Sequence, residues 1–152
     1  MAQFQIRKAT LTDLDAAFTI ITEYYEAAEV MARDTKEEVR AAYFGERGGI
    51  WLALVEEKVV GCVALREWNP AEHSGEIKRM YVQPEYRKLG IAQSLLNALE
   101  SFAVAVGYEW LYLDSAPGMD AAVRFYQKND YDPCSRYNDN PQATIFLCKG
   151  IA

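Results

Sequence analysis

The chain has few of the residues that build metal centres and disulfide frameworks. It contains 3 cysteines and 1 histidine in 152 residues, and no two cysteines form a C-x-x-C pair. An odd number of separated cysteines indicates reduced thiols rather than a disulfide framework or a zinc site. One histidine cannot supply a histidine-rich metal site. We therefore expect no metal.

Long apolar runs are also missing. No stretch approaches the roughly 18 apolar residues of a membrane-spanning helix, and the opening residues MAQFQIRKAT lack the apolar segment of a signal peptide. The hydrophobic share of 51% and the charged share of 25% are typical of a soluble globular protein. The sequence thus predicts a cytoplasmic protein without a membrane partner.

The chain has fewer basic than acidic residues, but several of the basic residues lie close together in the sequence. The formal net charge is −6, which repels a phosphate backbone at long range and disfavours nucleic acid as the main partner. A neutral or cationic substrate fits better. One short stretch before Gly90 nevertheless carries four basic residues against a single acidic one, Glu85. The four are Lys78, Arg79, Arg87 and Lys88.

Apolar periodicity predicts alternating strands and helices. The strongest helical pattern runs from Ile91 to Val106, with Gly107 as its C-terminal cap. Further helices are predicted over 10–28, from 34 to Gly45 or Gly48, and over 121–129. Strands are predicted over 3–8, 50–56, 59–67, 76–82, 110–114, 131–137 and 143–149. No linker or internal repeat interrupts this order, which indicates a single α/β domain with a mixed sheet.

The segment QPEYRKLG connects a strand that ends at Val82 to a helix that begins near Gly90. The first amides of a helix lack intrahelical partners and, with the helix dipole, form a seat for an anion. Glycine at position 90 allows close approach of a phosphate, and the small Ala92 leaves the first turn open. Arg87 and Lys88 add full charges, and each charge-assisted hydrogen bond contributes about 1.5–3 kcal/mol.

This pattern predicts a pyrophosphate site, although R-x-x-G-x-A alone also fits an ordinary strand-to-helix turn with solvated basic residues. Other phosphate-binding motifs are missing, because the chain has neither GxxxxGK[ST] nor GxGxxG. Nucleoside triphosphatases and dinucleotide-dependent enzymes are therefore disfavoured.

Three ordered segments resemble the GNAT superfamily of acyl-CoA-dependent N-acyltransferases: EIKRMYVQPEYRKLGIAQSLL, LYLDS and AAVRFYQKNDY. RKLGIA is similar to the R/Q-x-x-G-x-G/A pyrophosphate loop of that family, and AAVRFYQKNDY is similar to its A-x-x-x-Y-x-x-x-G-F segment. The resemblance covers nearly the whole chain. It implies a mixed, mostly antiparallel sheet of about seven strands flanked by about four helices. It also implies that the fourth and fifth strands splay apart.

The resemblance implies acetyl-CoA as co-substrate. The pantetheine arm would then pair with the backbone of Met80, Tyr81 and Val82, as an added strand pairs with a sheet edge, although the same residues also fit an ordinary core strand. Met119 stands where many members carry an asparagine that contacts the arm, so that contact is either lost or supplied by Ser115 or the local backbone. The pyrophosphate would contact Arg87, Lys88, Leu89, Gly90, Ile91 and Ala92.

Tyr126 occupies the position of the family tyrosine that donates a proton or a hydrogen bond to the departing thiolate. Complete transfer from a phenol with a pKa near 10 to a thiol with a pKa near 8.5 is uphill by about 2 kcal/mol. A hydrogen bond that strengthens as the sulfur gains charge is therefore favoured. Amphipathic packing is the alternative explanation for Tyr126. The segment ends in Asn129-Asp130-Tyr131 rather than glycine and phenylalanine, and the first two tolerate a left-handed backbone.

The attacking amine must lose a proton. Deprotonating a lysine-like amine with a pKa of about 10.4 costs roughly 4–5 kcal/mol at pH 7, so a base or a water relay is expected. Glu76 lies at the start of the fourth strand, where family members often place a base. Glu67 and His73 are alternatives, and a surface ion pair between Glu76 and Lys78 is another explanation.

The sequence therefore predicts an N-acetyltransferase in which a primary amine of a small molecule or peptide attacks acetyl-CoA directly. The alternative is a non-catalytic acyl-CoA-binding or sensing domain. A covalent mechanism through Cys62 is disfavoured because that residue lies in the middle of a predicted strand. Several side chains fit either an acceptor pocket or a homodimer contact: Tyr24, Tyr25, Trp68, Tyr137 and Asn138.

Overall fold

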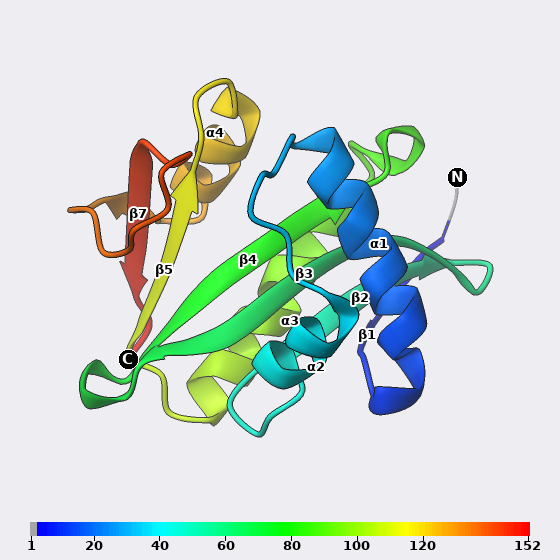
Figure 1. Cartoon of the computed structure of the whole chain (residues 1–152), viewed down its shortest axis with the longest axis horizontal. Helices are drawn as coiled ribbons and strands as arrows, with labels where there is room; N and C mark the ends of the chain where they lie inside the picture. The colour runs from blue at the N-terminus through cyan, green and yellow to red at the C-terminus, as the bar shows by residue number, and fades with distance from the viewer. Residues whose placement is uncertain (1–2) are drawn as a thin grey trace.

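The computed structural model describes residues 3–152. Seven strands form one mixed sheet in the order β1-β2-β3-β4-β5-β7-β6, with helices on both of its faces (Figure 1). The strands are β1 Gln5–Lys8, β2 Gly49–Val55, β3 Lys58–Asn69, β4 Ser74–Val82, β5 Trp110–Ser115, β6 Asp132–Pro133 and β7 Ile145–Gly150. The α-helices are α1 Leu14–Ala27, α2 Lys36–Tyr43, α3 Ile91–Ala105 and α4 Asp120–Lys128.

Two hydrophobic cores lie on opposite faces of the sheet. One joins α1 and α2 to alternate residues of β2 and β3, including Leu52, Cys62 and Ala64. The other joins α3 and α4 to the remaining residues, including Val63 and Leu65. Because both faces are covered, β2 is buried along its whole length. We refer below to the α1/α2 face and the α3 face.

The strands predicted over 50–56 and 59–67 form the hairpin of β2 and β3, but the tight turn that the sequence indicates around Glu57 and Lys58 lies one residue earlier. Val55 pairs with Lys58, so Glu56 and Glu57 form a two-residue turn. Both have positive φ, 50° and 67°, as a type I′ turn requires. This turn normally carries Asn-Gly or Asp-Gly, which is why two glutamates gave no register signal in the sequence.

The predicted strand over 131–137 is wrong in length. Only Asp132–Pro133 is paired as β6, and residues 134–144 form an irregular loop before β7. Pro133 has no amide to donate, and Asn140 and Pro141 favour turns. This loop folds back over the α1/α2 side of the molecule, where Gln142 accepts a hydrogen bond from Met31 N at 2.9 Å and donates one to Glu29 O at 3.2 Å.

The splay predicted between the fourth and fifth strands is present. β4 and β5 run parallel and pair only at their beginnings, from Ser74↔Trp110 to Glu76↔Tyr112. Beyond these pairs the two strands diverge (Figure 1). The opened edge of β4 runs towards the N-terminus of α3.

A β-bulge interrupts β4 just beyond the splay point. Ala64 of β3 pairs with Lys78, but the next assigned pair is Cys62↔Tyr81. Two residues of β4 therefore oppose one residue of β3, and Arg79 takes a left-handed backbone with φ 61°. Bulges of this kind redirect side chains and are frequent beside active sites.

None of the helices within residues 3–152 is long and apolar enough to cross a membrane.

Candidate functional site

Gly90 is the N-cap of α3 and has a left-handed backbone, with φ 88° and ψ 6°. An added Cβ would meet no atom within 4 Å, so backbone conformation rather than lack of room requires glycine at this position. Ser94 N donates to Gly90 O at 3.1 Å and begins the helical bonding. The amides of Ile91 and Ala92 precede it and have no intrahelical partner. The backbone at Gly90 therefore has the conformation that the predicted anion seat would need.

The basic residues of this loop differ in their surroundings. Arg87 folds back and donates from Nε to Val82 O at 2.8 Å, and its guanidinium lies 5.9 Å from the ring centre of Tyr81. It therefore connects the helix entrance to the end of β4, where the pantetheine arm is predicted. Lys88 has a left-handed backbone with φ 65° and is exposed, and Leu89 is exposed beside it.

Gly90→Ala is expected to weaken CoA binding about tenfold, the equivalent of one lost charge-assisted hydrogen bond. A left-handed alanine costs about 1–2 kcal/mol and favours rotation of the neighbouring amides away from the ligand. Gly107→Ala is the matched control, because Gly107 lies just beyond the other end of α3 with φ 94° and equally open surroundings. Calorimetric titration with CoA measures the effect. Equal losses of affinity in both variants would contradict an anion seat at Gly90.

Tyr126 lies on α4 and is 6% exposed, with its ring packed against Phe125 and Tyr131 at centroid distances of 5.1 and 5.4 Å. Burial raises the pKa of its hydroxyl far above the usual value, and Tyr24 and Glu100 raise it further. The phenol therefore keeps its proton. This makes full proton transfer to a thiolate more uphill than the sequence suggested and favours hydrogen-bond donation.

The turn after α4 survives the replacement of the family glycine. Asp130 takes the left-handed backbone, with φ 71°, and Tyr131 N donates to Tyr126 O at 3.1 Å. Ser115 ends β5 and is half-buried, and its carbonyl accepts from Thr144 N at 3.0 Å. Met119 is the N-cap of α4.

Glu76 is fully buried at the last pair before the splay. Arg66 donates to its Oε1, with Nε at 2.8 Å and Nη2 at 2.7 Å. Lys78 Nζ is farther away, 3.9 Å from Oε2. The suggested ion pair between Glu76 and Lys78 is present, but it is buried rather than at the surface, and Arg66 is the closer charge partner of the carboxylate.

The second carboxylate oxygen of Glu76 is held by the irregular loop 134–144. Tyr137 Oη donates to Oε2 at 2.7 Å, and Asn138 Nδ2 donates to the same oxygen at 3.0 Å. Burial raises the pKa of Tyr137, and the charge of Glu76 raises it further. The sequence indicates Tyr137 and Asn138 only as residues of an acceptor pocket or a homodimer contact, since nothing in a loop sequence shows which strand it will cover.

The alternative bases lie elsewhere. Glu67 is on the α3 face, where its Oε2 accepts from Arg47 Nε at 2.7 Å. His73 is exposed in the turn between β3 and β4, with a left-handed backbone. Cys62 is fully buried, burial raises its thiol pKa, and its Sγ donates to Arg79 O at 3.2 Å. A buried, protonated thiol is a poor nucleophile.

Asp114 is a site residue that the sequence did not predict. Its Oδ2 accepts from Asn138 Nδ2 at 2.6 Å and from Asn140 Nδ2 at 3.3 Å. The same Asn138 amide thus bridges Asp114 on β5 and Glu76 on β4. Asp114 belongs to the segment LYLDS, but the sequence assigns it no role, because its partners come from a loop more than 20 residues away along the chain.

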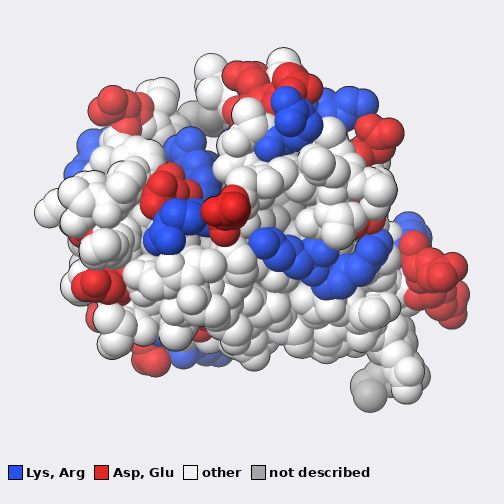
Figure 2. Space-filling view, turned by 90° about the horizontal axis from the view of Figure 1, so that it is seen from below, with Lys and Arg blue, Asp and Glu red and all other residues white. Residues whose placement is uncertain are grey.

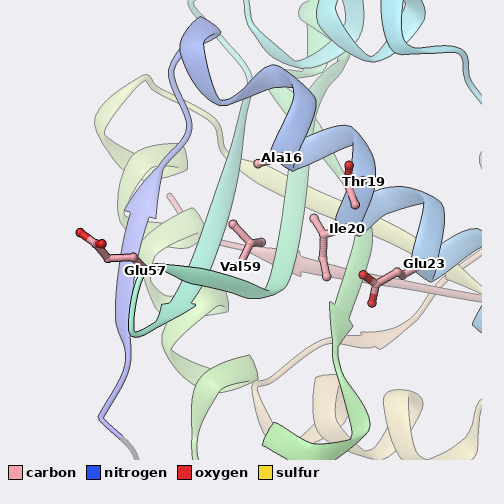
Figure 3. A pocket seen from close by; sticks show the side chains of 6 residues that line it. All are labelled: Ala16, Thr19, Ile20, Glu23, Glu57 and Val59. Carbon is pink, nitrogen blue, oxygen red and sulfur yellow. The ribbon is translucent and has the colours of Figure 1, made fainter.

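Two surface hollows within residues 3–152 lie away from the splay. One, of about 270 Å³, lies between α1 and the β2–β3 turn (Figure 3). Its lining includes Glu23, whose Oε1 accepts from Gln83 Nε2 at 2.9 Å just beyond β4. The other, of about 490 Å³, lies on the outer side of α3 around Glu100 and Val104. Neither is bordered by Glu76 or Tyr126.

Comparison with known proteins identifies the family and agrees with the fold. The profile of the Acetyltransferase (GNAT) family matches residues 14–131. Human N-acetyltransferase 8 is 35% identical over 94 residues, which are 59% of this chain and 41% of that protein. The chain thus spans well under half the length of that relative.

Solved structures agree as well. The crystal structure of an acetyltransferase of the GNAT family from Staphylococcus aureus Mu50 superimposes with a TM-score of 0.85 at 18% identity, over 99% of this chain and 100% of the other. The PaiA N-acetyltransferase of Thermoplasma acidophilum, solved with coenzyme A, gives 0.76 at 17% identity, over 97% and 99%. The chain belongs to the GNAT family of acetyltransferases, which use acetyl-CoA to acylate amines.

Proposed function

We propose that this protein transfers an acetyl group from acetyl-CoA to a primary amine of a small molecule or peptide by direct attack. The observation that carries the proposal is the opening between β4 and β5, to which we assign an anion seat at Gly90, the buried Tyr126 and the buried Glu76. These are the three groups that thioester aminolysis needs: a donor seat, a partner for the leaving sulfur and a proton acceptor.

The acyl donor is proposed to lie in this opening. The backbone of Met80, Tyr81 and Val82 is the edge that β5 leaves unpaired, and it would pair with the pantetheine amides. Ser115 lies at the end of the opposite strand. The diphosphate is assigned to the loop and first helical turn, comprising Arg87, Lys88, Leu89, Gly90, Ile91 and Ala92.

In the proposed reaction the amine nitrogen bonds to the thioester carbonyl carbon, and the carbon–sulfur bond breaks. Tyr126 donates a hydrogen bond to the sulfur as it becomes a thiolate. The amine proton passes to Tyr137 Oη while the Tyr137 proton moves to Glu76 Oε2, 2.7 Å away. This relay leaves the tyrosine neutral throughout, in keeping with the direction of its pKa.

The surface charge and the thiols suit a small cytoplasmic acceptor. On the face shown in Figure 2, basic side chains form separate groups with acidic side chains beside them rather than one continuous positive surface. Nucleic-acid binding favours a continuous basic surface. The cysteines are free thiols, which fits a reducing compartment. We therefore keep nucleic acid out of the proposed partners.

The test has two steps. Calorimetry should find one CoA bound per chain, and acetyl-CoA with a panel of amines should release free thiol only when an accepted amine is present. Hydrolysis without amine is the blank. CoA binding without amine-dependent thiol release would favour the acyl-CoA-sensing alternative. Folded protein that binds no CoA would contradict both the acetyltransferase proposal and the sensing alternative.

A further inference from the structure

The bulge in β4 places two cations on one face of the sheet. Successive strand residues normally point to opposite faces. Here Lys78 pairs with Ala64, which faces α1 and α2, and the extra residue Arg79 contacts Tyr24 and Tyr25 of α1 on the same side. Met80 returns to the α3 face. The left-handed Arg79 backbone is the strained conformation that makes this possible.

Arg79 has unused hydrogen-bonding capacity. Its side chain is 10% exposed, and it makes an ion pair through Nη2 with Asp34 Oδ2 at 3.3 Å. Its buried Nε has no hydrogen-bond partner in residues 3–152. A buried unpaired donor is destabilising. Binding of a ligand that accepts a hydrogen bond from Arg79 Nε would explain why this charged donor is buried without a partner in residues 3–152 on a strained backbone.

Lys78 is in a similar position. Its side chain is 15% exposed, and the 3.9 Å from Nζ to Glu76 Oε2 exceeds hydrogen-bond length. That oxygen already accepts from Tyr137 and Asn138. Within the described residues the Lys78 ammonium group therefore has donors available, and its side chain lies on the α1/α2 face of the sheet.

An acidic group lies across the splay from these cations. β4 and β5 are parallel, with Glu76 opposite Tyr112, so Lys78 and Asp114 are the next same-face positions on the diverging strands. Both hydrogen bonds to Asp114 go to Oδ2. Burial and the charge of Asp114 raise the pKa of Tyr24, and the charge of Arg79 lowers it. Tyr24 is therefore close enough to both Asp114 and Arg79 to feel their charges.

The charges around this space balance. Three cations, Arg66, Lys78 and Arg79, are matched by three carboxylates, Asp34, Glu76 and Asp114. A polyamine or a dianion would leave charge uncompensated, whereas a ligand with one positive and one negative group would not. The positive and negative groups are also on different strands, because the available donors are on β4 and the carboxylate of Asp114 is on β5.

We propose that the acceptor is an amino acid, whose carboxylate binds Lys78 and Arg79 and whose amino group is received by Asp114. This assignment rests on the proposed acetyl transfer and narrows its substrate. Arg79 supplies directional donors to the carboxylate, and Lys78 supplies a point charge. Asp114 holds the amine at the mouth of the splay, where the thioester is proposed to lie.

The test compares matched acceptors. Acetyl-CoA is offered with the common L-amino acids, β-alanine and γ-aminobutyrate, with their carboxamides, and with the corresponding amines that lack the carboxylate. The wild-type kcat/KM is expected to favour the best acid over its amide about tenfold to a hundredfold. Lys78→Met should abolish most of that preference by raising KM while CoA affinity is retained.

Two further variants sharpen the result. Lys36→Met removes an exposed lysine on α2 that pairs with Asp15 and should keep the preference. Asp114→Asn should lower the acid and amide rates alike, because it acts on the amino group. Wild-type turnover of amides or simple amines as fast as acids would overturn the inference and leave acetyl transfer standing. No thiol release with any amine would remove the proposed function itself.

Discussion

Tyr126→Phe is expected to reduce kcat about a hundredfold to a thousandfold, the usual cost of removing one donor to charge that develops in a transition state. The reason is that the sulfur leaves as a thiolate, and in the variant no phenol donates a hydrogen bond to it. Because the Tyr126 pKa is raised by burial, the wild-type enzyme should show no loss of this donor up to pH 10. Thiol release under saturating acetyl-CoA measures kcat, and CoA affinity should change little.

Tyr131→Phe is the matched control for this effect. Tyr131 packs against Tyr126 in the same aromatic cluster, and its hydroxyl donates to Glu100 Oε2 at 2.7 Å. Loss of the Tyr131 hydroxyl should lower the melting temperature and leave kcat unchanged. Tyr126→Phe should instead lower kcat and leave the melting temperature nearly unchanged. If both variants lose kcat equally, packing of α4 rather than a hydrogen bond to sulfur is the role of Tyr126.

The features that the sequence predicted well are those with local causes. Gly90 and Gly107 mark the two ends of α3, and the structure begins and ends that helix within two residues of them. The succession of strands along the chain followed from short apolar runs separated by turn residues. The splay followed from the family resemblance alone, since three pairs of β4 and β5 carry no signal that pairing then stops.

The features that the sequence missed have non-local causes. A bulge depends on how many residues of β3 oppose β4, which is a property of two strands, so it could not be seen in IKRMYV. Likewise, the burial of Glu76 depends on a loop some 60 residues away, whose Tyr137 and Asn138 cover it. Sequence periodicity describes one element at a time and is silent about such partners.

Glu76→Gln is expected to lower kcat/KM at pH 7 about a hundredfold to ten-thousandfold, the range for loss of a general base. The variant should then gain activity as pH rises towards the pKa of the accepted amine, because an amine that arrives neutral needs no base. The wild-type enzyme should level off at lower pH. A pH–rate profile for both proteins, with one accepted amine, measures the difference.

Glu67→Gln is the control for this profile. It removes the neighbouring carboxylate, which lies on the α3 face and pairs with Arg47, and it should leave the pH dependence unchanged. Glutamine at position 76 also weakens the contact with Arg66 and sets its own amide against the Asn138 donor. Some loss of stability, about 1–3 kcal/mol, is therefore expected. A structural role alone would lower activity by the same factor at every pH, so parallel profiles would show that Glu76 positions Tyr137 and Asn138 without accepting the proton.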